Sequence, residues 1–181
     1  IDEELSDGIK ALCRERGVSL YMLLLSTLDI LLHKLSGTED IVVGSPVANR
    51  HYQETEGMIG FFVNTLVARA RILGRDCFES VLDSVKTDIL ESYAHQDVPF
   101  EQLVDVLSIE RSTNRNPVFQ VMFTFSNKAR KEKNIFEDIE SHNIANEYSV
   151  SKFDLEMVCY ELFNGCLGVK IKYLQDLYKA E

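Results

Sequence analysis

One predicted helix is apolar nearly all round, and it constrains the fold of this chain more than any other segment. Ser19 is a suitable N-cap, and helical spacing continues through Leu35 to a stop at Ser36-Gly37. A helix of this kind has to bury most of its surface, so other elements must surround it. The run contains Asp29 and Lys34 and is too short to span a bilayer. We therefore expect the core helix of a cytoplasmic protein that makes no membrane contact.

Helical and strand patterns alternate around this helix. Further helices are predicted from Leu5 to a cap at Gly17, from Phe78 to about Tyr93 with Asp76 as a possible cap, and from Pro99 through Leu107. Strands are predicted at Asp40–Val47, Phe61–Ile72 and Val118–Phe125, the last of them central, with a loop from Arg50 to Met58. The aromatic residues of these strands, Phe61 among them, are most simply core. This alternation indicates an α/β fold.

The clearest hairpin lies near the end of the chain. Apolar residues alternate with polar ones from Phe153, Asn164-Gly165 supplies the turn, and the return strand runs to Tyr173. The charged segment from Lys128 to Ser151 precedes it and is predicted to be a long excursion or an irregular strand pair. Its basic cluster is interpreted as a solvated loop or, alternatively, as a small docking face for an acidic protein.

Composition limits the classes of function. With 181 residues and 45% hydrophobic content the chain can bury a core, and one domain over residues 1–181 is the default. A net charge of −10 argues against nucleic-acid binding, because no concentrated cationic surface is available. The four cysteines form no Cys-x-x-Cys pair and have no metal-ligand histidine nearby, which predicts a reducing compartment and no metal site.

Four motifs follow one another in order, and three of them combine polar residues with a proline that stiffens the backbone. They are Gly37–Arg50, Ile59–Leu66, Asp97–Val104 and Arg111–Phe123. In this order and spacing they resemble the condensation domain of nonribosomal peptide synthetases, over nearly the whole chain. That family joins two carrier-tethered thioesters into an amide. The resemblance implies a chloramphenicol acetyltransferase-like subdomain, with a mixed sheet and helices packed on one side.

The family's catalytic His-His-x-x-x-Asp-Gly motif lies in its amino-terminal half, and none of the four histidines here has that context. We therefore expect residues 1–181 to be the carboxy-terminal subdomain, truncated at both ends relative to the full domain. It would form one wall of the acyl-transfer tunnel and be inactive by itself. The alternatives are a non-catalytic carrier-protein-binding module and half of a related epimerization or cyclization domain.

The resemblance also implies the partners. They are the amino-terminal half of the same domain and the upstream and downstream carrier proteins, whose phosphopantetheine arms bring the substrates; no cofactor is expected to bind directly. Within the excursion, four apolar residues would be stranded without the other half, which predicts self-association of the fragment. These residues are Ile135, Phe136, Ile139 and Ile144.

Two residues are candidates for substrate contact. Ser45 follows a buried strand and precedes a proline, and by analogy with the acetyltransferase it would donate to the oxyanion. Its alternative role is to satisfy a local backbone group. Asn64 lies in an apolar strand, where its amide either orients substrate or bridges neighbouring strands.

The other motif residues are predicted to be mainly structural: Asn49, Arg50, Pro99, Phe100, Arg115, Asn116 and Pro117. Arg50 is a candidate to pair with a carboxylate across the seam between the two halves. Arg115 either clamps loops or meets a pantetheine phosphate. His95 stands at a helix end and is interpreted as a capping residue.

Overall fold

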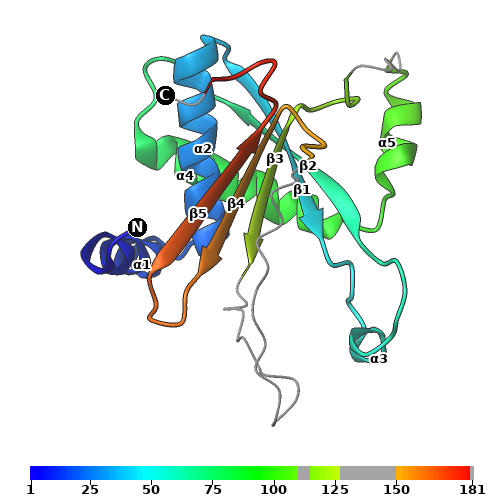
Figure 1. Cartoon of the computed structure of the whole chain (residues 1–181), viewed down its shortest axis with the longest axis horizontal. Coiled ribbons are helices and arrows are strands. Elements are labelled where there is room, and N and C mark those ends of the chain that lie inside the picture. Colours follow the sequence, from blue (N-terminus) through cyan, green and yellow to red (C-terminus); the bar gives the residue numbers. More distant parts are fainter. Residues whose placement is uncertain (110–114, 127–149, 180–181) are drawn as a thin grey trace.

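The computed structural model describes residues 1–109, 115–126 and 150–179 (Figure 1). Within them, one sheet has five strands in the order β2-β1-β3-β4-β5. The strands are β1 Asp40–Val47, β2 Asn64–Arg71, β3 Val121–Ser126, β4 Leu155–Glu161 and β5 Leu167–Tyr173. Strand β3 runs parallel to β1 and β4, whereas β1–β2 and β4–β5 are antiparallel pairs. The sheet is therefore mixed, and β3 is its central strand, as predicted.

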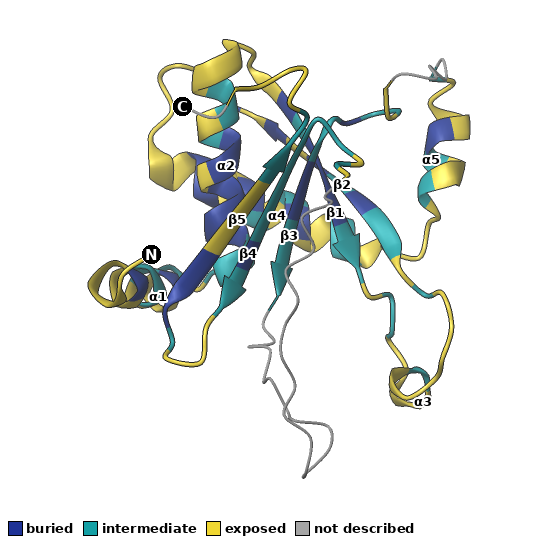
Figure 2. Ribbon diagram, viewed as in Figure 1, coloured by how far each residue is buried: buried dark blue, intermediate teal, exposed yellow. Residues whose placement is uncertain are grey.

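The helices are α1 Glu3–Arg16, α2 Leu20–Ser36, α3 Gln53–Glu56, α4 Phe78–Ala94 and α5 Phe100–Val106. Helices α2 and α4 cover one face of the sheet. Helices α2 and α4 pack against each other and against β1 and β2. Leu25 of α2, Val43 of β1 and Phe123 of β3 are fully buried in the resulting core (Figure 2). The α/β fold with helices on one side of a mixed sheet is confirmed.

Local capping explains why the first two helices begin and end where the sequence predicts. Asp2 accepts a hydrogen bond from the Leu5 amide, and Ser19 accepts one from the Met22 amide. Gly17 and Gly37 end the two helices with φ of 60° and 71°, a conformation that glycine adopts without steric cost. Within the described residues no single helix has the length and hydropathy of a membrane span. Only α1 and α2 together pass such a test, and they are bent by 106°.

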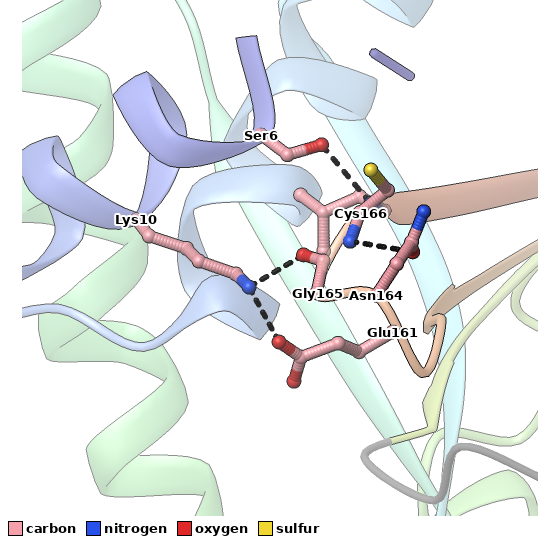
Figure 3. A network of polar contacts seen from close by, with 7 residues as sticks. Ser6, Lys10, Glu161, Asn164, Gly165 and Cys166 are labelled. Carbon is pink, nitrogen blue, oxygen red and sulfur yellow. Dashed lines mark hydrogen bonds and ion pairs between the residues drawn. The ribbon is translucent and has the colours of Figure 1, made fainter. Parts of the chain in front are cut away.

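Polar contacts attach α1 to the tip of the β4–β5 hairpin (Figure 3). Lys10 donates to the Glu161 carboxylate and to the Gly165 carbonyl, both at 2.5 Å. The buried Ser6 hydroxyl accepts from the Leu167 amide at 3.0 Å. Gly165 has φ of 82°, and its amide donates to the Leu162 carbonyl, so the turn includes Asn164-Gly165 as predicted.

Several predicted boundaries are wrong. Strand β2 begins at Asn64 rather than at Phe61, because pairing with β1 ends where Val47 meets Asn64. Strand β3 begins at Val121 rather than at Val118, whose φ of 72° is incompatible with a strand. The short helix α3 occupies part of the loop predicted from Arg50 to Met58.

Two further predictions concern the residue that caps α4 and the charged segment after β3. Helix α4 is capped at Cys77, whereas the Asp76 carboxylate accepts from the Leu73 amide. Most of the predicted excursion from Lys128 to Ser151, including its four apolar anchors, lies outside the described residues.

An aromatic cluster covers the face of the sheet opposite α2 and α4. The Phe119 ring is buried and lies 5.5 Å from Phe100 and 5.8 Å from Phe153, measured between ring centroids. It presses on Gly44 so closely that a Cβ atom there would lie 2.2 Å from the ring. Glycine is therefore required at this position of β1, and Phe119 couples the centre of the sheet to α5.

We expect Gly44→Ala to destabilise the fold by about 1–3 kcal/mol or more, because the buried Phe119 ring has no free space to move into. Chemical denaturation measures the free energy of unfolding. Gly8→Ala is the matched control, since a Cβ atom at Gly8 of α1 meets nothing within 4 Å and alanine favours a helix. Equal stabilities for Gly44→Ala and the wild type would contradict the close contact.

Asp29 is an ionisable group buried in the core. It lies on α2 with 2% of its surface exposed, and among the described residues it forms no ion pair. Burial raises the pKa of its carboxyl from 3.8 to about 7. The folded chain therefore holds the Asp29 proton more tightly than the unfolded chain does.

Stability should consequently fall as pH rises from about 4 to about 7, and remain low above that range. Asp29→Asn keeps the side chain neutral, so we expect it to gain roughly 2–4 kcal/mol at pH 8 and little at pH 4. Unfolding experiments across this pH range measure the difference. Asp83→Asn, at an exposed site on α4, controls for net charge. A gain that is independent of pH would contradict the assignment.

Candidate functional site

Three of the four predicted motifs meet at a hollow of about 280 Å³ between the start of β2 and the start of α5. Four predicted residues line it: Asn49, Asn64, Pro99 and Phe100. The other lining residues are Phe61, Phe62, Val63, Thr65, Asp97 and Glu101. Aromatic rings and proline make much of this lining apolar, while exposed Asp97 and Glu101 make its rim acidic.

Asn64 connects β2 to the segment between α4 and α5. Its side-chain NH₂ donates to the Gln96 and Val98 carbonyls, both at 2.8 Å. Its side-chain oxygen accepts from the Phe100 amide at 3.2 Å and from the Thr65 amide at 2.9 Å. One amide thus satisfies backbone groups more than thirty residues away, at the mouth of the hollow. These contacts favour a bridging role, although the bridge joins a strand to a loop and not to another strand.

Arg50 holds the chain that follows β1. Its guanidinium lies over the Phe62 ring, 4.2 Å from the centroid, and donates to the Thr55 carbonyl. Both contacts are within the β1–β2 loop, residues 48–63. A carboxylate partner across a seam would belong to another part of the protein, so that prediction stays open.

Asn49 and its neighbour link this loop to the α5 segment. Asn49 has φ of 50°, a conformation in which asparagine is more common than most other residues. Its side-chain oxygen lies 2.9 Å from the His51 ring, and that ring lies 3.3 Å from the Asp97 carboxylate. This polar chain therefore links the β1–β2 loop to Asp97, which precedes α5.

Ser45 lies away from the hollow, on the side of β1 that faces the helices. Only 2% of its surface is exposed. Its side chain forms a hydrogen bond with the Tyr21 phenol, whose pKa is raised by burial and lowered in part by that bond. The Tyr21 ring packs 5.4 Å from Phe123. In this arrangement the Ser45 hydroxyl does not face open space.

Arg115, Asn116 and Pro117 precede β3 and lie outside the lining of the hollow. Arg115 and Asn116 are exposed, and the Asn116 side chain donates to the Lys152 carbonyl at 3.0 Å. The Pro117 carbonyl accepts from the Phe119 amide at 2.9 Å, which closes a tight turn around Val118. This turn places the Phe119 ring against Gly44. The motif residues Arg111–Asn114 lie outside the described residues.

The three histidines within the described residues all form local contacts. The His33 ring donates to the Thr38 carbonyl, His51 belongs to the polar chain above, and His95 is the C-cap of α4. Within residues 1–109, 115–126 and 150–179, no group of three or more His, Cys, Asp or Glu side chains is placed to hold a metal ion.

Sequence reasoning missed the apolar tip of the β1–β2 loop. The prediction that Phe61 belongs to the core is wrong, because 93% of its surface is exposed. Ile59 and Met58 are exposed beside it. Gly57 and Gly60 flank Met58 and Ile59 and were the available signal, since closely spaced glycines interrupt a strand.

The whole chain matches one family. A family model described as the condensation domain covers residues 1–181. A plipastatin synthase protein of Bacillus subtilis (strain 168) is 40% identical over 181 residues, which are 100% of this chain and 7% of that protein. Bacitracin synthase 2 of Bacillus licheniformis is 39% identical over 181 residues, which are likewise 100% of this chain and 7% of that protein.

Solved structures show the same fold. The condensation domain from the Monacolin K polyketide synthase MokA has a TM-score of 0.84 at 20% identity, covering 99% of this chain and 41% of that one. The first condensation domain of the CDA synthetase has a TM-score of 0.74 at 18% identity, covering 97% and 38%. A four-domain nonribosomal peptide synthetase bound to AMP and glycine has a TM-score of 0.82 at 23% identity, covering 99% and 15%.

This chain thus spans a small part of each synthase and about two fifths of the two solved condensation domains. The match of its full length to the family model, together with 40% and 39% identity to two peptide synthases, shows the family. The chain belongs to the condensation-domain family of the nonribosomal peptide synthetases.

Proposed function

We propose that this chain is the carboxy-terminal part of a peptide-bond-forming condensation domain and supplies one wall of its acyl-transfer tunnel. One observation carries the proposal. The whole chain matches the family, yet it covers only 41% and 38% of two solved condensation domains, and its described histidines are all engaged in capping or loop contacts. The base that removes the proton from the attacking amine would then come from the remaining part.

The substrates in this proposal are aminoacyl or peptidyl thioesters on the phosphopantetheine arms of upstream and downstream carrier proteins. The hollow beside Asn64 supports a wall role, because apolar side chains line it while hydrogen bonds and an aromatic contact fix its backbone. Fixed geometry of this kind positions bound groups without further ordering cost. The free thiols of all four cysteines support a cytoplasmic enzyme.

A carrier-binding module without catalysis is the second candidate. It is favoured by the absence of the His-His-x-x-x-Asp-Gly motif from this sequence, and it predicts carrier affinity without product formation in any context. The first candidate predicts that the missing part restores the reaction.

We expect the isolated chain to form no amide product, because the sequence lacks the family's His-His-x-x-x-Asp-Gly motif, which would supply the base for the amine proton. The assay incubates it with loaded donor and acceptor carrier proteins and quantifies the product by mass spectrometry. The control is the complete condensation domain under the same conditions. Product above the no-protein background from the isolated chain would contradict the half-domain proposal.

Ser45 has two proposed roles, which one pair of variants separates. Because its hydroxyl is buried against Tyr21, we expect Ser45→Ala and Tyr21→Phe each to lower the stability of the complete domain by about 1 kcal/mol and to leave the chemical rate within a few-fold of wild type. Denaturation and single-turnover kinetics measure the two effects. A rate lowered roughly ten- to a thousand-fold by Ser45→Ala alone, with stability unchanged, would instead identify Ser45 as an oxyanion donor.

A further inference from the structure

The hollow between β2 and α5 carries charge of one sign. The described residues that line it include two carboxylates, Asp97 and Glu101, and no lysine or arginine. Both carboxylates are exposed, one just before α5 and the other in its first turn. Among the described residues their only ion-pair partner is the His51 ring, which lies 3.3 Å from Asp97. The rim therefore attracts a positively charged group.

Aromatic rings line the hollow next to these carboxylates. Phe61, Phe62 and Phe100 are lining residues, together with Val63 and Pro99. The face of an aromatic ring attracts a cation, and the Arg50 guanidinium already lies 4.2 Å from the Phe62 centroid. Rings beside carboxylates form a surface that suits an apolar stem with a positively charged end.

The amide side chains of the lining already have partners within the chain. Asn64 donates to two backbone carbonyls and accepts from two backbone amides, which uses its full hydrogen-bonding capacity. The side-chain oxygen of Asn49 lies 2.9 Å from the His51 ring. Discrimination between ligands therefore depends on the rings and on the two carboxylates.

We propose that the hollow binds the positively charged side chain of a basic aminoacyl group, such as lysyl or ornithyl, while that group is attached to its carrier arm. This inference rests on the proposed function and names the substrate class of the same site. The volume of about 280 Å³ suits one side chain, because pockets for drug-sized ligands begin at about 300 Å³.

Charge also decides which part of the tethered substrate enters the hollow. The phosphate of the pantetheine arm is negative and is repelled by Asp97 and Glu101, so it lies elsewhere. An apolar aminoacyl side chain contacts the rings but leaves the carboxylates without a partner, whereas a basic one satisfies both. Because the carboxylates are exposed, each is expected to change the affinity by about two- to fivefold.

Binding of two matched compounds to the complete condensation domain tests the inference. Lysyl-pantetheine amide and norleucyl-pantetheine amide share the same straight carbon stem, and only the lysyl compound ends in an ammonium group. Calorimetry should show that the lysyl compound binds about four- to twenty-five-fold more tightly, and Glu101→Gln or Asp97→Asn should each reduce this ratio by about two- to fivefold. Glu91→Gln, at an exposed site on α4, is the matched control and should keep the ratio.

Equal affinities for the two compounds would overturn the inference, and a basic side chain from the remaining part of the domain that fills the hollow would give this result. A lysyl preference that survives both substitutions would overturn it too, because the cation would then bind elsewhere. The unmodified domain is also measured at low and high ionic strength, which keeps the test decisive if a variant does not fold. Salt should reduce the preference, and a preference independent of salt would contradict the inference.

Amide formation identifies the carrier that delivers the basic group. Lysyl or norleucyl groups are loaded on the donor carrier protein in one series and on the acceptor in the other, and kcat/KM is compared within each. A lysyl preference in either series supports the inference and assigns the hollow to that substrate, whereas equal values in both series would overturn it. No amide in any series, with the lysyl affinity retained, would instead overturn the proposed function and leave the binding site in place.

Discussion

The packing of α2 against the centre of the sheet is the contact on which the other features depend. Leu25, Val43 and Phe123 are fully buried there, and each comes from a different element. Because protein interiors are packed as tightly as organic crystals, this contact fixes the position of β1 and β3 within a small tolerance. The polar ends of those strands, where the motifs lie, are therefore held by a largely apolar layer. Asp29 and Ser45 are polar residues that are buried with it.

Contacts on the opposite face of the sheet fix the position of the hollow. Phe119 presses on Gly44 in β1 and contacts Phe100 at the start of α5, so α5 is positioned by the sheet itself. Asn64 then ties the same segment to β2 through its amide. Two independent contacts, one apolar and one polar, thus hold one wall of the hollow. Residues from motifs that lie far apart in the sequence therefore contact one another, and these contacts are structural.

Much of the fold could be predicted because its signals are local. Ser19 and Gly37 mark the ends of α2 by their own conformational preferences, and the alternation around Asn164-Gly165 specifies the hairpin. The start of β2 could not be predicted in this way. Phe61, Phe62 and Val63 favour strands as strongly as the residues after them, and only the end of pairing with Val47 separates the two groups. The roles of Asn64 and Phe119 depend on partners distant in sequence, which no local pattern reveals.

Recombining the two parts tests the central claim most directly. The chain is mixed with a separately produced amino-terminal part of the same condensation domain and with loaded donor and acceptor carrier proteins, and the amide product is followed over time. The account predicts product only when both parts are present, with a yield that saturates as the second part is titrated. No product from the mixture, although the complete domain is active and the two parts bind each other, would contradict it.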